Sequence, residues 1–382
     1  MAEDVKDLLE RAVGWYEPAE QGPEGPRRRA ERRHGRQRVM AAVVAFALFA
    51  AAGAFTWGAF RHTGAVTSPG ASPIASPHRI TLTTISLDRE GVAGIGFDGT
   101  TLWVCTAPPG GGIGDIARLW PVDPTTGKPT GSPFKLQSCA TGSPVFADGD
   151  LWIDGISRID LQTGRTTALP VEGSPEAFWD GSVWATGRAG VVRIDPVTNR
   201  VQAVVFAQRW AGRFVIDQGD IWFVRSASVY RVDPATDQII ATIRLPGFSN
   251  APGEVHINAM AAGDGAVWAA SAGAGTLLRI DPATNRVTAV VHTGARNLLG
   301  VVAAGGRVWA IGTRTIARNT TEQLWEVDPS SNRTLGQGVT ILPPGHLGFP
   351  IVAAGGSLWV GDLGDQYPGR AGFRLVKIDF SP

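Results

Sequence analysis

Glu254 and His256 stand two positions apart in a segment that also holds Gly and Pro, and their side chains suit acid–base chemistry. A carboxylate beside an imidazole can provide a general base and an electrostatic stabiliser near neutral pH. These two residues are the catalytic candidates of the sequence. No further cluster of His or Glu accompanies them, so we favour an exposed or simply hydrogen-bonded pair.

A second set of polar residues predicts recognition of a ligand or protein partner. Its members stand in long segments between expected strands, where binding residues often lie. The set comprises Asp115, Arg118, Arg314, Arg318, Glu322, His346, Asp362, Asp365, Tyr367 and Arg370. The alternative interpretation is that these segments are solvated insertions without a ligand.

Metal binding is not predicted. Asp362 and Asp365 carry the oxygen ligands that calcium prefers, but neither an EF-hand loop nor a Cys and His cluster surrounds them. No sequence motif indicates a cofactor.

Cys105 and Cys139 are the two cysteines of the chain. Both fall in the first repeat, and an oxidising compartment would allow a disulfide between them. Closing a loop of about 34 residues would contribute roughly 3 to 4 kcal/mol in the chain-entropy model. The alternative is that another strand lies between the two thiols and keeps them apart.

A repeat supplies the elements that must position these residues. Seven times, a Gly- and Asp-rich turn precedes an aliphatic residue and a tryptophan, and a segment similar to Arg-Ile-Asp-Pro follows. The tryptophans are Trp103, Trp152, Trp184, Trp222, Trp268, Trp309 and Trp359, and the aspartates are Asp123, Asp160, Asp195, Asp233, Asp281, Asp328 and Asp379. A unit of 32 to 50 residues made of strands and turns is typical of a β-propeller. We therefore predict an all-β fold, a seven-bladed β-propeller over residues 79–382, with the tryptophans packed between blades.

Each blade is expected to contain four strands. In the repeat at residues 255–292 we place them at 257–262, 266–270, 277–280 and 287–291. The last connection starts at Asp281, whose carboxylate can accept backbone N–H bonds, and Asn285 stands where a positive φ is wanted. The same place in other repeats holds Gly127, Gly164, Asn199, Asp237 and Asn332. This pattern favours a repeated hairpin turn over six functional carboxylates.

The seventh repeat ends at residue 382 without an outer strand. A β-rich segment at residues 79–87 precedes the first inner strand and has no other role. We predict that it pairs beside residues 373–378 and completes the last blade, because propellers close their rings and remove free strand edges.

Ring closure also predicts which polar residues meet. The separations from tryptophan to aspartate are 20, 8, 11, 11, 13, 19 and 20 residues in chain order. The long connections therefore belong to blades 6, 7 and 1, which closure makes neighbours. We expect the candidate recognition residues to gather there, on the face opposite the tight turns.

Residues 39–60 form a stretch of 22 residues without a charge. As a helix this stretch would span roughly 33 Å, enough for the hydrocarbon core of a bilayer. Seven arginines lie within residues 27–38, immediately before it, which predicts a cytoplasmic N-terminus and an extracytoplasmic propeller. A cleaved secretory signal is the alternative, but its apolar stretch would be shorter and nearer the N-terminus.

The segments around this predicted membrane anchor have their own expected roles. Residues 1–38 should form a cytoplasmic Arg-rich segment with a short amphipathic helix, and residues 3–16 are a candidate contact for a cytoplasmic partner. Residues 61–78 contain Ser-Pro three times and predict an extended linker.

The charge of the large domain argues against nucleic acid as a partner. Residues 79–382 contain 25 Lys and Arg against 26 Asp and Glu, so no broad basic face is expected. The partners that remain are the bilayer, through residues 39–60, and an extracytoplasmic ligand or protein.

The repeat is similar to a known group of propellers. Gly-Asp-Gly-x-Val-Trp at residues 263–268, followed by Leu-Arg-Ile-Asp-Pro-Ala-Thr-Asn-Arg-Val at residues 278–287, resembles the YVTN-type and streptogramin-lyase-like β-propellers. The likeness covers residues 79–382. It implies a propeller fold and a group that includes binding proteins, surface proteins and a few lyases.

Three functions follow as expectations. The first is a membrane-anchored, non-catalytic module that binds a ligand or protein for display or sensing. The second is a lyase or hydrolase near the central opening on the face of the long connections, using Glu254, His256 or a loop carboxylate. Convergent buried carboxylates or histidines at the mouth of the central channel would favour this enzyme, whereas an apolar or Arg-lined mouth would favour binding. The third is signalling through the cytoplasmic helix.

Overall fold

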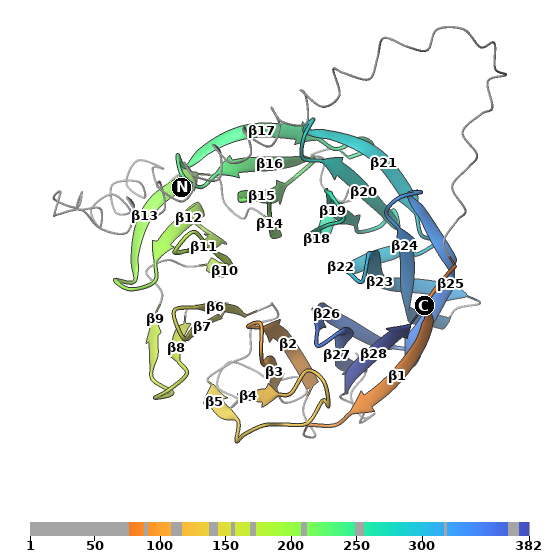
Figure 1. The fold of residues 1–382 in the computed structure, drawn as a ribbon, viewed down its shortest axis with the longest axis horizontal. Helices are drawn as coiled ribbons and strands as arrows, with labels where there is room; N and C mark the ends of the chain where they lie inside the picture. The colour runs from red at the N-terminus through yellow and green to blue at the C-terminus, as the bar shows by residue number, and fades with distance from the viewer. Residues whose placement is uncertain are drawn as a thin grey trace, which may run out of the picture. The chain divides into compact units, whose positions relative to one another are not determined.

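The repeats form seven four-stranded antiparallel sheets, which stand as blades around a common centre (Figure 1). The computed structural model describes residues 76–87, 91–107, 117–136, 144–153, 157–168, 173–207, 212–248, 256–316, 319–365 and 374–381. The predicted seven-bladed β-propeller is confirmed.

Blades 1 to 4 follow one another along the chain. Blade 1 contains β2 (Gly91–Phe97), β3 (Leu102–Ala107), β4 (Ala117–Val122) and β5 (Phe134–Leu136). Blade 2 contains β6 (Val145–Ala147), β7 (Asp150–Ile153), β8 (Ser157–Asp160) and β9 (Thr166–Ala168). Blade 3 contains β10 (Gly173–Trp179), β11 (Ser182–Gly187), β12 (Gly190–Asp195) and β13 (Arg200–Phe206). Blade 4 contains β14 (Phe214–Asp217), β15 (Asp220–Arg225), β16 (Ser228–Asp233) and β17 (Gln238–Arg244).

Blades 5 to 7 complete the ring. Blade 5 contains β18 (Ile257–Gly263), β19 (Ala266–Ser271), β20 (Thr276–Asp281) and β21 (Arg286–His292). Blade 6 contains β22 (Asn297–Ala304), β23 (Arg307–Ile316), β24 (Asn319–Asp328) and β25 (Arg333–Leu342). Blade 7 contains β26 (His346–Ala354), β27 (Ser357–Asp365) and β28 (Leu375–Ser381), with β1 (Arg79–Ile85) as its outer strand. The strands predicted in blade 5 agree with these bounds to within about one residue at each end.

The turn between the third and outer strands has the chemistry that the repeat predicted. In blade 5, the Asp281 carboxylate accepts a backbone N–H from Ala283 at 2.8 Å and the Thr284 hydroxyl at 3.0 Å. Asn285 has a φ of 54°, and the equivalent residues of the five other predicted turns also have positive φ. These aspartates therefore build hairpins, as expected, because their oxygens are occupied by the turn itself.

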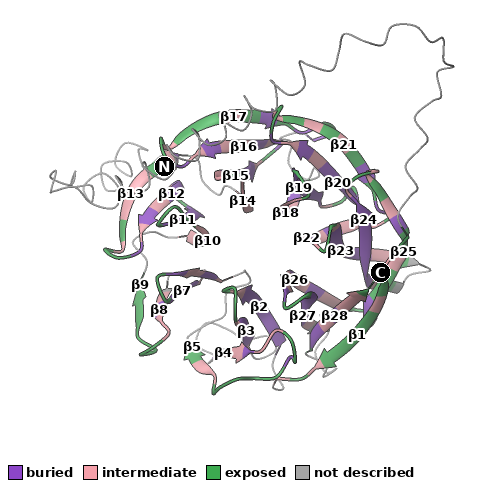
Figure 2. Cartoon of the chain, viewed as in Figure 1, coloured by how far each residue is buried: buried purple, intermediate pink, exposed green. Residues whose placement is uncertain are grey.

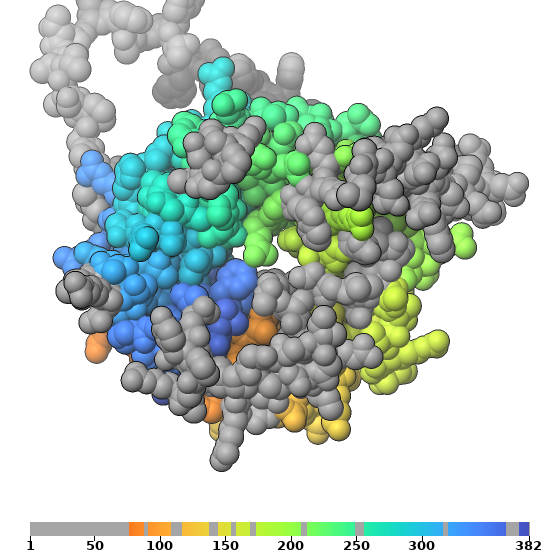
Figure 3. Space-filling model, turned by 180° about the vertical axis from the view of Figure 1, so that it is seen from behind, coloured from red at the N-terminus to blue at the C-terminus, as the bar shows by residue number. Residues whose placement is uncertain are grey.

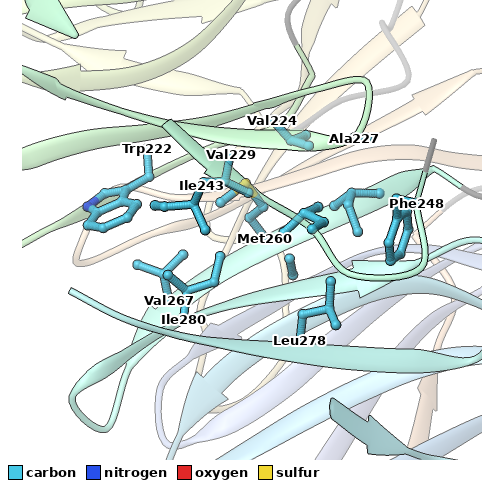
Figure 4. Close-up of a cluster of buried hydrophobic side chains, with 13 residues drawn as sticks. Trp222, Val224, Ala227, Val229, Ile243, Phe248, Met260, Val267, Leu278 and Ile280 are labelled. Atoms are coloured by element: carbon cyan, nitrogen blue, oxygen red, sulfur yellow. The ribbon is translucent and has the colours of Figure 1, made fainter. Parts of the chain in front are cut away.

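The tryptophans on the second strands fill the spaces between blades. Six of them, all except Trp103, have no exposed surface, and each packs on the next blade. Figure 4 shows one such contact, where Trp222 of blade 4 lies beside Val267 and Ile280 of blade 5. Truncating a buried tryptophan to alanine typically costs about 3 to 5 kcal/mol, so each interface depends strongly on one side chain.

The arginine of the Arg-Ile-Asp-Pro segment links consecutive blades, a role that the sequence did not reveal. The Arg231 guanidinium lies 4.9 Å from the Trp222 ring centroid and donates to the Pro282 carbonyl of the next blade at 2.6 Å. Arg193 donates in the same way to the Pro234 carbonyl at 3.0 Å. These arginines are therefore structural, since they join one blade to the turn of the next.

The first described strand closes the ring, as predicted. β1 pairs antiparallel with β28 from Arg79 opposite Ser381 to Ile85 opposite Leu375. Just before it, His78 donates its backbone N–H to Glu326 of blade 6 at 2.8 Å. Figure 2 shows that outer strands such as β1 and β17 are mainly exposed, whereas buried residues line the strands nearer the centre. The closing strand thus covers the edge of β28.

The predicted anchor, amphipathic helix and most of the linker lie outside the described residues and stay predictions. Within the described part of the chain there is no helix that is long and apolar enough to cross a membrane.

Candidate functional site

Among the described strands, those of blades 6 and 7 extend farthest on the face of the long connections. β23 and β24 contain ten residues each and β27 contains nine, whereas β19 and β20 of blade 5 contain six. The long connection of blade 6 is therefore mainly a continuation of its hairpin. Arg314 and Glu322, expected in a loop, lie within these strands.

Seen from behind, the space-filling surface is hollowed near its centre (Figure 3). Green residues of the middle blades, blue residues of the last blade and orange residues of the first blade border the hollow. The inner strands, which begin on the face of the long connections, surround this centre (Figure 1). We call the region where these strands begin the channel mouth; it includes Arg213, Asn258 and Phe349.

One arginine crosses the channel mouth. Arg213 directly precedes β14 of blade 4, and its guanidinium carbon lies 5.2 Å from the ring centroid of Phe349 in β26 of blade 7. Its Nε donates to the Asn258 carbonyl of blade 5 at 3.0 Å. The Asn258 side chain then donates to the Leu298 carbonyl of blade 6 at 2.9 Å. Side chains of blades 4 and 5 thus connect four of the seven inner strands.

Two buried acids hold the start of β26, next to Phe349. Glu322 and Asp362 both have no exposed surface. The Glu322 Oε2 atom accepts the Gly348 backbone N–H at 2.6 Å, and the Asp362 carboxylate lies 2.9 Å from His346 Nδ1. The two acids therefore fix the segment that carries Phe349.

Gly348 is required at this point because the space beside its backbone is filled. A Cβ atom added there would lie 2.7 Å from Val360 Cγ1 and 3.0 Å from Glu322 Oε1. Only a residue without a side chain lets β26 approach the buried acid closely enough for the hydrogen bond to Glu322.

Burial changes the ionisation of Glu322. Loss of solvation raises the pKa of Glu322 to about 8; the Gly348 hydrogen bond opposes this shift and the nearby Asp362 charge adds to it. At neutral pH Glu322 is accordingly mostly protonated. Its Oε1 atom is buried without a hydrogen-bond partner among the described residues. A neutral side chain is the form that such a site stabilises.

The structure brings together three of the ten candidate recognition residues: Glu322, His346 and Asp362. Arg118 lies on β4 and Arg314 on β23, both partly exposed. The backbone of Asp365 ends β27. Asp115, Arg318, Tyr367 and Arg370 lie outside the described residues. Because Glu322 and Asp362 are buried, they position other groups instead of meeting a ligand from solution.

The structure describes only one of the two catalytic candidates. His256 is exposed just before β18, and its backbone carbonyl accepts the Ala272 N–H at 2.7 Å. Glu254 lies outside the described residues. The proposed acid–base pair therefore stays a prediction.

Sequence reasoning missed Arg213, Asn258 and Phe349. Asn258 and Phe349 both stand ten residues before the tryptophan of their blade, at irregular points of the inner strands, where blades 1 and 6 have Ala93 and Leu299. A comparison of this one position between repeats would have shown a polar and an aromatic residue in place of small or aliphatic ones.

Cys105 is disulfide-bonded. Cys139 lies outside the described residues, so its pairing with Cys105 stays a prediction. Among the described residues no three His, Cys, Asp or Glu side chains stand as a group that could hold a metal ion.

The fold defines this chain as a seven-bladed β-propeller. No family model matches the chain, and no curated protein matches it. Among solved structures, Kuenenia stuttgartiensis hydrazine synthase is similar, with a TM-score of 0.41 and 16% sequence identity. That match covers 52% of this chain and 59% of the other, so the chain spans less than two thirds of that protein's chain.

Proposed function

We propose that this propeller is a non-catalytic binding module that recognises a ligand or protein at the channel mouth and on the neighbouring ends of blades 6, 7 and 1. The contact of Arg213 with Phe349 is the observation that carries the proposal. It places an arginine and an aromatic ring, residue types that are enriched at binding hot spots, at the centre of one face. The neighbouring acids are buried and serve to fix the backbone that carries Phe349.

The location of the module is part of the proposal. Residues 39–60 would anchor it in the membrane, with residues 1–38 in the cytoplasm and the propeller outside. The repeat that resembles YVTN-type propellers fits display or sensing at a surface. Residues 3–16 would be free to contact a cytoplasmic partner.

Photo-crosslinking from the two faces tests the recognition surface. A photoreactive residue at Arg314, which is partly exposed on β23, should give a saturable crosslink to a component of the native cell envelope. The same residue at Asp264, in an exposed turn on the opposite face, is the matched control. Equal crosslinking from both positions, or none from Arg314, would refute the proposed surface.

A lyase or hydrolase is the second candidate, and one geometry favours it. His346 Nδ1 lies 2.9 Å from Asp362, which is the arrangement of a base oriented by a carboxylate. The side chain of His346 is 11% exposed, so a substrate could reach only this member of the pair. A turnover that disappears in His346→Ala but survives in His256→Ala would support an enzyme, and equal turnover in the two variants would exclude this assignment.

A further inference from the structure

We propose that Arg213 is the anion-recognition group of the channel mouth and that it binds the carboxylate of an organic ligand whose apolar body lies against Phe349. This inference rests on the proposed binding function and names the chemistry of its ligand. It follows from the way the guanidinium is held, from the atoms it leaves available and from the charges around it.

The guanidinium is fixed before any ligand arrives. Nε is used by the Asn258 carbonyl at 3.0 Å, and one face of the group lies on the Phe349 ring at 5.2 Å. These contacts come from blades 5 and 7, while the side chain itself comes from blade 4. An arginine oriented in this way loses little freedom on binding, which is what strengthens a planar two-point contact.

The two terminal nitrogens remain available. Within the described residues the Arg213 hydrogen bond uses Nε alone, and the terminal nitrogens are not among the buried atoms without partners. Arg213 is partly exposed, so a ligand at the mouth can reach this end of the side chain. Two parallel N–H groups match the two oxygens of a carboxylate, which is the geometry that arginine recognises best.

The aromatic side of the site is equally fixed. Glu322 holds Gly348, the residue before Phe349, and Asp362 holds His346. Both acids thus have partners within the same strand of blade 7. Phe349 is partly exposed, so it offers a fixed apolar surface beside the guanidinium.

Several arginines lie at the ends of described strands on the face of Arg213. They are Arg118, Arg188, Arg225, Arg296, Arg314 and Arg374. Arg118, Arg188 and Arg225 already have partners, as does the acid Glu176 of a neighbouring inner strand. Arg296 and Arg374 are exposed and Arg314 is partly exposed. These three side chains add positive charge to this face, which favours an anion near Arg213.

The probe is 4-fluorobenzoate, which combines a carboxylate with a ring, and 4-fluorobenzamide is its uncharged counterpart. Fluorine NMR of the full-length protein in mild detergent should show saturable binding of the benzoate in the millimolar range, about that of a small fragment with one charged contact. The benzamide should bind at least about tenfold more weakly, because it cannot form the charged pair.

Variants of the protein locate the binding. Arg213→Gln should weaken the benzoate by about tenfold or more, and Arg213→Lys should also weaken it because a lysine lacks the two-pronged donor. Arg296→Gln, which removes an exposed arginine from the same face, is the matched control and should bind as the wild type does. If Arg213→Gln does not fold, Phe349→Leu replaces it and should weaken binding while leaving the guanidinium in place.

Several outcomes would overturn the inference. They are equal binding of the benzoate and the benzamide, unchanged binding by Arg213→Gln or Phe349→Leu, and absence of saturation in the wild type up to about 20 mM probe. Displacement of the probe by inorganic phosphate at lower concentration than by acetate would assign the site to phosphate instead. If crosslinking from Arg314 succeeds while the probe fails to bind, only the assignment of an anion ligand is wrong. If the probe binds while crosslinking fails, the proposed recognition surface is wrong.

Discussion

Replacement of Glu322 by glutamine should remove a pH dependence of stability that the buried carboxyl creates. Burial raises its pKa from 4.5 to about 8 in the folded protein. Between those two values the unfolded chain loses the proton and the folded chain keeps it. The folded state therefore binds more protons, so its free energy of unfolding falls as pH rises through this window and becomes level above pH 8.

The size of the effect follows from the width of the window. Each pH unit changes the free energy of unfolding by about 1.4 kcal/mol, so the wild type should lose about 3 kcal/mol from pH 5 to pH 7 through this group. The free energy of unfolding should continue to fall up to about pH 8, so the total loss from pH 5 to pH 8 should be about 4 kcal/mol. Glutamine has no proton to lose and can still accept the Gly348 N–H, as neutral Glu322 does. Glu322→Gln should thus match the wild type near pH 5 and exceed its stability near pH 8.

Urea unfolding followed by tryptophan fluorescence from pH 5 to pH 9 measures this difference. The comparison with the wild type cancels the titration of all other groups that the substitution leaves unchanged. Asp264→Asn is the matched control, because it also changes an acid to an amide, but in an exposed turn where Asn tolerates the φ of 51°. Parallel pH profiles of Glu322→Gln and the wild type would show that the buried carboxyl is ionised throughout, and the reasoning would fail.

Three further predictions concern the ring itself. Deletion of residues 79–85 should abolish cooperative melting, because β28 then becomes a free edge; a soluble product with a sharp thermal transition would contradict this. Gly275→Ala should destabilise the fold by about 2 to 4 kcal/mol in urea unfolding, because the added Cβ would collide with a carbonyl oxygen of the neighbouring loop. Gly265→Ala is the control: its φ is also positive but the space around it is open, so it should cost about 1 kcal/mol. Alkylation without reductant should leave Cys105 and Cys139 unmodified in the intact mass, and two modified thiols would rule out their disulfide.

The architecture was predictable because each of its devices is local and repeated. A turn that begins with an aspartate such as Asp281, followed four positions later by a residue that tolerates a positive φ, can be recognised within ten residues of sequence. In the structure Asn285 has this positive φ, and Asp281 accepts the N–H bond of the turn. The number of blades then follows from the seven tryptophans that stand at the same position of the repeat. Closure by β1 was also predictable, because one repeat lacked a strand and one β-rich segment had no repeat.

The channel mouth was not predictable, because its contacts are neither local in the sequence nor repeated. Arg213 and Phe349 are far apart in the chain and belong to blades on opposite sides of the centre (Figure 1). No local pattern links them, since their contact depends on the diameter of the ring and on the irregular start of β26. The burial of Glu322 and Asp362 had the same origin: the sequence placed them in long connections, whereas the hairpins of blades 6 and 7 continue and carry them into the packed region between blades.

Closure and the candidate site are physically connected through blade 7. Within the described sheets this blade takes one strand from the start of the propeller and three from its end, and its inner strand carries Phe349. β28 lies between β1 and β27, and β27 carries Asp362, which holds His346 at the start of β26. Loss of β1 would therefore weaken the support of β27 and β26 in turn. Because Arg213 of blade 4 can reach Phe349 only across an intact ring, binding at the channel mouth should require the same pairing that closes the propeller.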